Sequence, residues 1–175
     1  MSDFWVFGYG SLMWRPGFRY VESSPAVLRG AHRALCVYSW VHRGTREHPG
    51  LVLGLDRGGS CRGVAFRVAA TDRAPVMRYL RERELVTDVY IEVERAVDLP
   101  AGRVTAVAYL ADRRHPQYAG LLPREELLRV VRESSGRSGT NADYIANTVA
   151  HMRAVGIRDA TLEWLADALS RQRQG

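Results

Sequence analysis

Two glycines near the start of the chain mark a turn that could bind an anion. The apolar, aromatic run Phe4-Trp5-Val6-Phe7 ends in Gly8-Tyr9-Gly10-Ser11. A strand that finishes in two glycines one residue apart turns sharply and leaves its backbone bare. Because bare N–H groups that converge on a small space suit a carboxylate or an oxyanion, this turn is a candidate binding site.

A run of alternating charges, Arg81-Glu82-Arg83-Glu84, supplies the second candidate. Such a run is usually a solvated helix face, but Glu84 stands where the helix must end and the chain re-enters the sheet. A carboxylate at that point can face the mouth of a barrel. If neighbours such as Leu85 and Tyr90 partly bury it, its pKa rises toward the range that suits acid/base catalysis.

Other kinds of chemistry find little support in the sequence. The turn lacks the third glycine of a dinucleotide fingerprint and the flanking pattern of a nucleophile elbow. No pair of the five histidines has the helical spacing of metal ligands, so no metal site is predicted. Ser11 with a distant histidine would form a hydrolytic pair without an identifiable third member. All 25 basic residues are Arg, which excludes a lysine nucleophile or Schiff base and a Walker-type phosphate loop.

Charge and composition narrow the class of partner. The net charge of +6 favours small anions, while the arginines are spread along the chain rather than clustered with aromatics, so we expect no nucleic-acid partner. No apolar run reaches the roughly 18 residues that span a bilayer, and the N-terminus lacks the pattern of a signal peptide. We therefore expect a cytoplasmic protein with no membrane partner, in which Cys36 and Cys61 are reduced thiols.

The elements that must position these residues segregate along the chain, with strands first and helices last. Small residues on one side of a strand, Cys61, Gly63 and Ala65, indicate close approach of another element, as inside a small barrel. The sequence predicts the α+β class and one domain over residues 1–175, with barrel strands and an inserted helix over about 3–112 and C-terminal helices over about 123–173. The expected strands are 4–9, 26–40 with a break near Gly30, 51–55, 61–68 after a hairpin at Asp56-Arg57-Gly58-Gly59, 90–97 and 104–111; the expected helices are 71–85, 124–134, 141–155 and 159–173.

Four stretches of the chain, in order, also match a known pattern. They are Val6-Phe7-Gly8-Tyr9-Gly10-Ser11-Leu12 followed by Trp14 and Pro16-Gly17-Phe18; Arg43-Gly44-Thr45 with Glu47 and Pro49-Gly50-Leu51-Val52-Leu53-Gly54-Leu55; Tyr79-Leu80-Arg81-Glu82-Arg83-Glu84; and Ser138-Gly139-Thr140-Asn141-Ala142-Asp143-Tyr144. Together they span nearly the whole chain and resemble the ChaC-type γ-glutamylcyclotransferases, which act on glutathione. One departure is Leu85-Val86-Thr87 after Glu84, where family members in animals and yeast often have two glycines.

The resemblance implies a small mixed β-barrel with flanking helices and the cleavage of glutathione to 5-oxoproline and cysteinylglycine without a cofactor. Glu84 is then the catalytic acid/base, and the helix start at 138–144 supplies Tyr144 to the site. The loop that holds the γ-glutamyl group consists of Gly8, Tyr9, Gly10, Ser11, Leu12 and Met13.

The chemistry of this reaction agrees with the residues at hand. The α-amine of the substrate attacks the γ-carbonyl of the same molecule, so the enzyme needs no nucleophile. One carboxylate can take a proton from the amine and return it to the departing amine. We expect Arg43 and Arg46 to meet the glycine carboxylate of glutathione. Two alternatives remain: a cyclotransferase for other γ-glutamyl peptides or amines, and a non-catalytic barrel that binds RNA or another anion.

Overall fold

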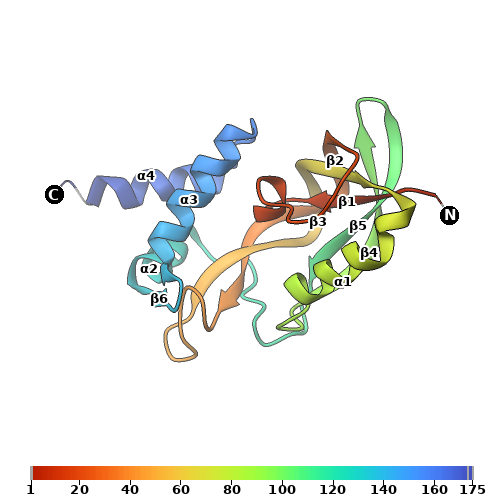
Figure 1. The fold of residues 1–175 in the computed structure, drawn as a ribbon. Coiled ribbons are helices and arrows are strands. Elements are labelled where there is room, and N and C mark those ends of the chain that lie inside the picture. The colour runs from red at the N-terminus through yellow and green to blue at the C-terminus, as the bar shows by residue number, and fades with distance from the viewer. Residues whose placement is uncertain (1, 173, 175) are drawn as a thin grey trace. The chain divides into compact units, whose positions relative to one another are not determined.

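The computed structural model describes residues 2–172 and 174, and it confirms the α+β class. Five strands close into a barrel in the order β1-β3-β2-β4-β5, and helices accompany it (Figure 1). The strands are β1 (Phe4–Gly8), β2 (Glu22–Ser39), β3 (Gly50–Val68), β4 (Tyr90–Leu99), β5 (Gly102–Ala111), β6 (Ser135–Gly136) and β7 (Gly139–Thr140). The helices are α1 (Arg73–Glu84), α2 (Arg124–Glu133), α3 (Asn141–Ala154) and α4 (Ala160–Gln172), with short 3-10 helices at Ser11–Met13 and Ala70–Asp72. The final residue of the expected last helix, Arg173, lies outside the described residues.

The chain forms two compact units. The first consists of residues 1–34 and 54–115, and the second of residues 35–53 and 116–175. The long strands β2 and β3 contribute residues to both units. The single domain over residues 1–175 stays a prediction.

In the first unit, β1 lies between two partners. It pairs antiparallel with β3, with Gly8 opposite Val64, and parallel with β5, with Val6 opposite Val107. Strands β4 and β5 form a long antiparallel hairpin that starts with Tyr90 opposite Ala111. Strand β1 therefore ends inside the sheet, which fixes where the following glycine turn begins.

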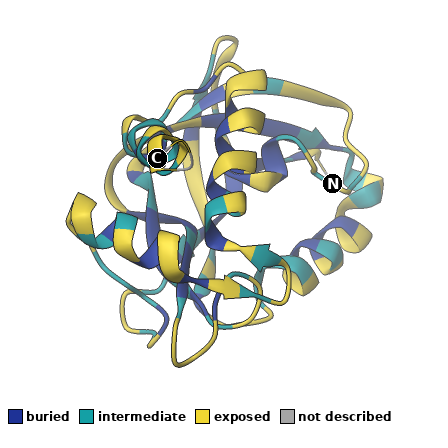
Figure 2. Ribbon diagram, turned by 90° about the vertical axis from the view of Figure 1, so that its left-hand side faces the viewer, coloured by how far each residue is buried: buried dark blue, intermediate teal, exposed yellow. Residues whose placement is uncertain are grey.

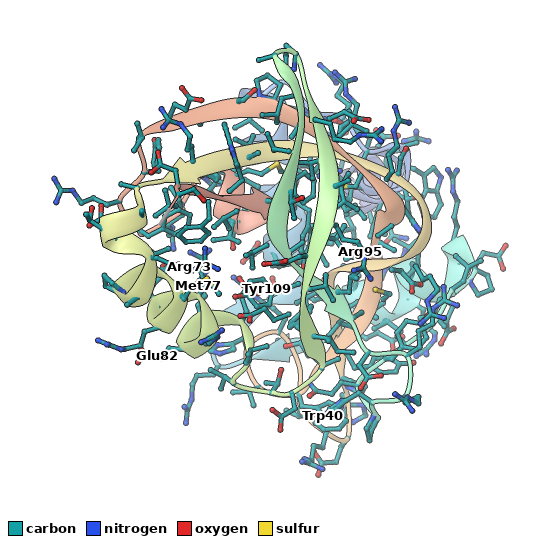
Figure 3. The ribbon with its side chains drawn as sticks, turned by 90° about the vertical axis from the view of Figure 1, so that its right-hand side faces the viewer. Trp40, Arg73, Met77, Glu82, Arg95 and Tyr109 are labelled. Atoms are coloured by element: carbon teal, nitrogen blue, oxygen red, sulfur yellow. The ribbon has the colours of Figure 1, made fainter. Side chains whose placement is uncertain are left out.

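Helix α1 packs on this barrel through one side. Val76, Met77 and Leu80 are buried among apolar residues of the strands, and Met77 points from the helix toward the strands (Figure 3). Burying side chains of this size stabilises the contact by about 1.5–3 kcal/mol each. The core cluster consists of Phe4, Val6, Leu12, Val68, Val76, Met77, Leu80, Val107 and Tyr109. Because Leu12 belongs to this cluster, the same core holds both the helix and the turn after β1.

Two strand predictions were wrong in the same way. The expected hairpin near Gly58 is not a reversal, because β3 continues through it as one strand, and β2 continues through Gly30. Gly58, Gly59 and Gly30 have φ values of +98°, +72° and +93°, which bend a strand without ending it. The His32 ring lies 2.9 Å from the Gly58 carbonyl oxygen, and this contact helps to hold the bend.

In the second unit, helices α2, α3 and α4 each bury one side. Figure 2 shows buried and exposed residues alternating around the helices. The buried apolar positions are Leu127, Val130 and Val131 in α2; Ile145, Val149 and Met152 in α3; and Leu162 and Leu165 in α4. Helix α3 has a side-chain cap, since the Thr140 hydroxyl accepts a hydrogen bond from the Asp143 N–H at 3.1 Å. In the described part of the chain, no helix is long and apolar enough to cross a membrane.

Candidate active site

The segment after β1, residues 8–17, is a tightly packed loop that we call the glycine-turn loop. A Cβ added at Gly8 would lie 2.9 Å from the Cβ of Leu12, so no larger residue fits there without movement. Ser11 opens a single 3-10 turn in which the Met13 N–H donates to the Gly10 carbonyl at 2.9 Å. The side chains of Leu12 and Met13 are buried, so packing explains why both positions are apolar.

An arginine that the sequence analysis did not single out fixes the other side of this loop. The Nε of Arg33 donates to the Tyr9 carbonyl at 2.6 Å, and its Nη2 donates to the Arg62 carbonyl at 2.7 Å. The Tyr9 peptide is therefore held by β2 as well as by its own turn. No spacing in the sequence links Arg33 to Tyr9, because the pairing depends on the register of the barrel.

Glu84 is the last residue of α1, and only 16% of its side chain is exposed. The residues that follow it, Leu85 and Tyr90, pack against the core cluster. Burial raises the pKa of the Glu84 carboxyl, and the neighbouring charge of Arg83, whose Nε lies 3.7 Å from Oε1, acts in the opposite direction. The condition stated from the sequence is met, since Glu84 is partly buried and its pKa is raised, and its catalytic role stays a prediction.

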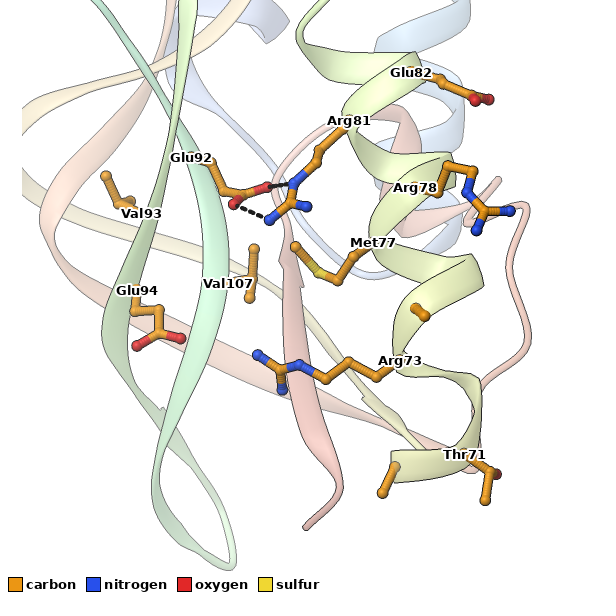
Figure 4. Close-up of a pocket in the computed structure, with 12 residues that line it drawn as sticks. Thr71, Arg73, Met77, Arg78, Arg81, Glu82, Glu92, Val93, Glu94 and Val107 are labelled. Carbon is orange, nitrogen blue, oxygen red and sulfur yellow. Dashed lines mark hydrogen bonds and ion pairs between the residues drawn. The ribbon is translucent and has the colours of Figure 1, made fainter. Parts of the chain in front are cut away.

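The other charges of the Arg81–Glu84 run have separate surroundings. Arg81 donates twice to Glu92 at 3.0 Å, and this pair lines a pocket of about 950 Å³ between α1 and strands β4 and β5 (Figure 4). Glu82 points away from the strands (Figure 4). Tyr109 donates to Glu92 at 3.0 Å, and its pKa is raised, first by burial and then by this carboxylate. Of the two carboxylates in this run, Glu84 is the one that is partly buried with a raised pKa, which suits acid/base work, whereas Glu82 is exposed.

Tyr144 and Arg43, two more predicted site residues, lie together in the second unit. The Tyr144 hydroxyl accepts a hydrogen bond from the Leu53 N–H at 2.9 Å, and burial raises the pKa of Tyr144 to about 12. The Arg43 guanidinium lies 5.7 Å from the centre of the Tyr144 ring and donates to the Thr140 carbonyl at 3.1 Å. These contacts hold Arg43 and Tyr144 in place, and their contact with a substrate stays a prediction.

The start of β3, just after the loop that carries Arg43, is held by Asn141, to which the sequence analysis assigned no role. The side-chain amide of Asn141 bonds both the N–H and the carbonyl of Leu51, at 2.8 and 2.9 Å, and is fully buried. Arg46, the last predicted site residue, is exposed and stacks on Trp40 at 4.3 Å from the ring centre. In the second unit the structure brings Arg43 close to Tyr144. In the first unit, Arg83 near the end of α1 donates to the Ser11 hydroxyl of the glycine-turn loop.

Fold and site together define a small closed β-barrel protein with a tight glycine turn and a partly buried carboxylate at a helix end. Residues 4–172 match the family model described as ChaC-like protein, and the chain belongs to this family. The resemblance inferred from the four sequence stretches is therefore confirmed.

The relatives carry consistent names. The chain is 36% identical over 156 residues to the glutathione-specific gamma-glutamylcyclotransferase of Escherichia coli, covering 89% of this chain and 68% of that protein. It is 34% identical to the human glutathione-specific gamma-glutamylcyclotransferase 1, covering 94% of this chain and 78% of that protein. A crystal structure of a glutathione-specific gamma-glutamyl cyclotransferase from yeast covers 98% of this chain and 97% of its own, with a TM-score of 0.84 at 22% identity. This last likeness confirms the expected barrel with flanking helices.

Proposed function

We propose that this protein is a γ-glutamylcyclotransferase that cleaves glutathione into 5-oxoproline and cysteinylglycine. The observation that carries the proposal is the Glu84 carboxylate, which is partly buried, has a raised pKa and follows Arg83, whose guanidinium donates to Ser11 of the glycine-turn loop. Family membership and the names of the relatives support the same reaction. The closed barrel supplies the rigid frame on which such a site depends.

The reaction balances within the substrate. The α-amine of the γ-glutamyl group forms a bond to the γ-carbonyl carbon and closes a five-membered ring, and the amide bond to the cysteine nitrogen breaks. Glu84 takes the proton that the attacking amine loses and returns it to the departing amine of cysteinylglycine. A carboxyl whose pKa is raised by burial performs both transfers more readily near neutral pH than an exposed one.

The remaining predicted residues bind and orient the substrate in this proposal. The loop residues Gly8–Met13 hold the γ-glutamyl part in a folded form, because the amine must lie within reach of its own carbonyl. Arg43 and Arg46 supply positive charge for the glycine carboxylate of glutathione. Tyr144 orients Arg43 through ring contact. We place the reaction in the cytoplasm, where cysteines such as Cys36 and Cys61 stay reduced, and cell fractionation would test this location.

Mass spectrometry of purified protein incubated with glutathione tests the proposal. The wild type should release 5-oxoproline, and Glu84→Gln should not. The matched control is Glu82→Gln, since Glu82 lies two residues earlier and is exposed. Thermal unfolding of Glu84→Gln should occur at or above the wild-type temperature, because burial penalises the charged form that this variant lacks. Full activity of Glu84→Gln would remove Glu84 from the mechanism.

The pH dependence and a substrate panel sharpen the assignment. Because the general base must be ionised and the pKa of Glu84 is raised, kcat/KM should fall on the acidic side at a pH above that of an ordinary carboxyl. Turnover of γ-glutamyl dipeptides or amines in preference to glutathione would keep the reaction and change the substrate. Absence of 5-oxoproline from every substrate would refute the proposal.

A further inference from the structure

Arg83 joins the end of helix α1 to the glycine-turn loop through four hydrogen bonds. Its Nη1 donates to the carbonyl oxygens of Arg15, at 2.6 Å, and Pro16, at 3.2 Å. The same nitrogen donates to the Tyr79 hydroxyl at 3.0 Å. Its Nη2 donates to the Ser11 hydroxyl at 2.7 Å. One side chain therefore contacts both ends of the 11–16 segment.

The contacts are those of an enclosed side chain. Only 19% of the Arg83 side chain is exposed, compared with 56% for Arg81 in the same helix. Tyr79 lies one turn before Arg83 on the same helix face, as i and i+4 residues do. Gly17 permits this arrangement, because a Cβ there would lie 2.0 Å from the Tyr79 hydroxyl oxygen, and its φ is +74°. The loop, Tyr79 and Arg83 thus fit together only with glycine at position 17.

We propose that Arg83 is a positioning residue that locks the glycine-turn loop to the helix end carrying Glu84, so that the bound substrate and the carboxylate keep a fixed geometry. The inference rests on the proposed function for its catalytic consequence. A planar guanidinium with five donors can reach the four acceptors at once, whereas a lysine ammonium cannot. Arg83 itself need not touch the substrate to act in this way.

The same side chain also sets the electrostatic surroundings of Glu84. Within the described part of the first unit, Arg83 on the same helix is the charge that acts on the pKa of Glu84, and Glu84 in turn contributes to the raised pKa of Tyr109 on β5. Arg83 opposes the effect of burial on the pKa of Glu84. Tyr109 stays neutral over the working pH range, because burial and Glu92 raise its pKa. Removing the cation should therefore move the acidic limb of the pH profile upward.

Three variants test the proposal: Arg83→Met, Arg83→Lys and the control Arg78→Met. Arg78 lies on the same helix and is exposed, and its replacement by methionine removes the same charge as Arg83→Met does. With 5-oxoproline release as the assay, Arg83→Met should lower kcat by about 100-fold, since a small misplacement of reacting groups has that effect. It should also shift the acidic limb of kcat/KM to higher pH. Arg83→Lys should restore the position of the limb and leave kcat low, and Arg78→Met should match the wild type.

A second measurement does not depend on turnover. Hydrogen–deuterium exchange of peptides that cover residues 9–17 should be faster in Arg83→Met and Arg83→Lys than in the wild type and Arg78→Met. Unchanged exchange in both Arg83 variants would overturn the positioning role even if no substrate were turned over. Full rescue of kcat by lysine would overturn it as well, since charge alone would then suffice. If exchange were faster in the Arg83 variants but the wild type released no 5-oxoproline, the proposed function would be refuted and the positioning of the loop by Arg83 would still hold.

Discussion

Gly63→Ala should impair the site without altering any group that we assign to the chemistry. Gly63 lies on β3 next to the end of β1, and a Cβ there would be 2.3 Å from the Gly8 carbonyl oxygen and 2.7 Å from a ring carbon of Phe7. Ordinary van der Waals contact begins at 3.4 Å. The Gly8 carbonyl must therefore move by about 1 Å, which displaces the start of the glycine-turn loop. Overpacking of this kind costs about 1–3 kcal/mol of stability.

The loss of activity should be larger than the loss of stability alone would explain. A displacement of about 1 Å can lower the rate about 100-fold, so we expect kcat/KM for 5-oxoproline release to fall by that order while circular dichroism shows a folded protein. The control is Val97→Ala, which removes a fully buried side chain from β4 and leaves the loop untouched. It should lower the unfolding temperature similarly with kcat/KM close to the wild type. If Gly63→Ala kept the kcat/KM and the stability of the wild type, the reasoning would be refuted.

Two further variants test stability alone. Asn141→Ala leaves the buried N–H and carbonyl of Leu51 without their side-chain partner, at about 1–3 kcal/mol for each group, so urea denaturation should show a loss of several kcal/mol. A loss below about 1 kcal/mol would contradict this. Glu92→Gln should lower the free energy of unfolding at neutral pH by about 0.5–1 kcal/mol, because its partner Arg81 is largely exposed. The folded-state pKa of Glu92 is lowered, first by Arg81, so its contribution is present above the unfolded-state pKa and lost as pH falls through the folded one. Denaturation at several pH values should therefore show the two proteins converging in acid, and a constant difference would argue against the ion pair.

Much of the barrel could be predicted because its signals are local. The small residues Cys61, Gly63 and Ala65 indicated a close approach, and Gly63 does lie against the Gly8 backbone and the Phe7 ring. The strands expected at 90–97 and 104–111 are both present, and they pair with each other as the antiparallel hairpin β4–β5. The hairpin at Gly58 was wrong because two glycines with positive φ serve equally in a reversal and in a bend. Long-range pairing with β1 and β2 decided between these, and sequence periodicity does not contain that information.

The same limit applies to the site. Glu84 was found because it ends a helix next to apolar residues, and this local fact implies burial. Arg33 and Asn141 were missed because each binds a backbone group that is distant in sequence, Tyr9 and Leu51 respectively. Because the acceptor or donor is a backbone group, the partner's residue type does not reveal the hydrogen bond. Contacts of this kind follow from the register of the strands, which the structure provides.

The four charged residues at the end of α1 have four different surroundings, although they lie within one turn of the helix. Successive residues on a helix point about 100° apart, so four of them cover its circumference. Arg81 meets Glu92 on the strand side, Glu82 faces solvent, Arg83 reaches the glycine-turn loop and Glu84 is partly buried. Sequence alone presents an alternation that suits a solvated face. The direction in which each position faces, rather than the type of charge, therefore separates the acid/base candidate from its positioning neighbour.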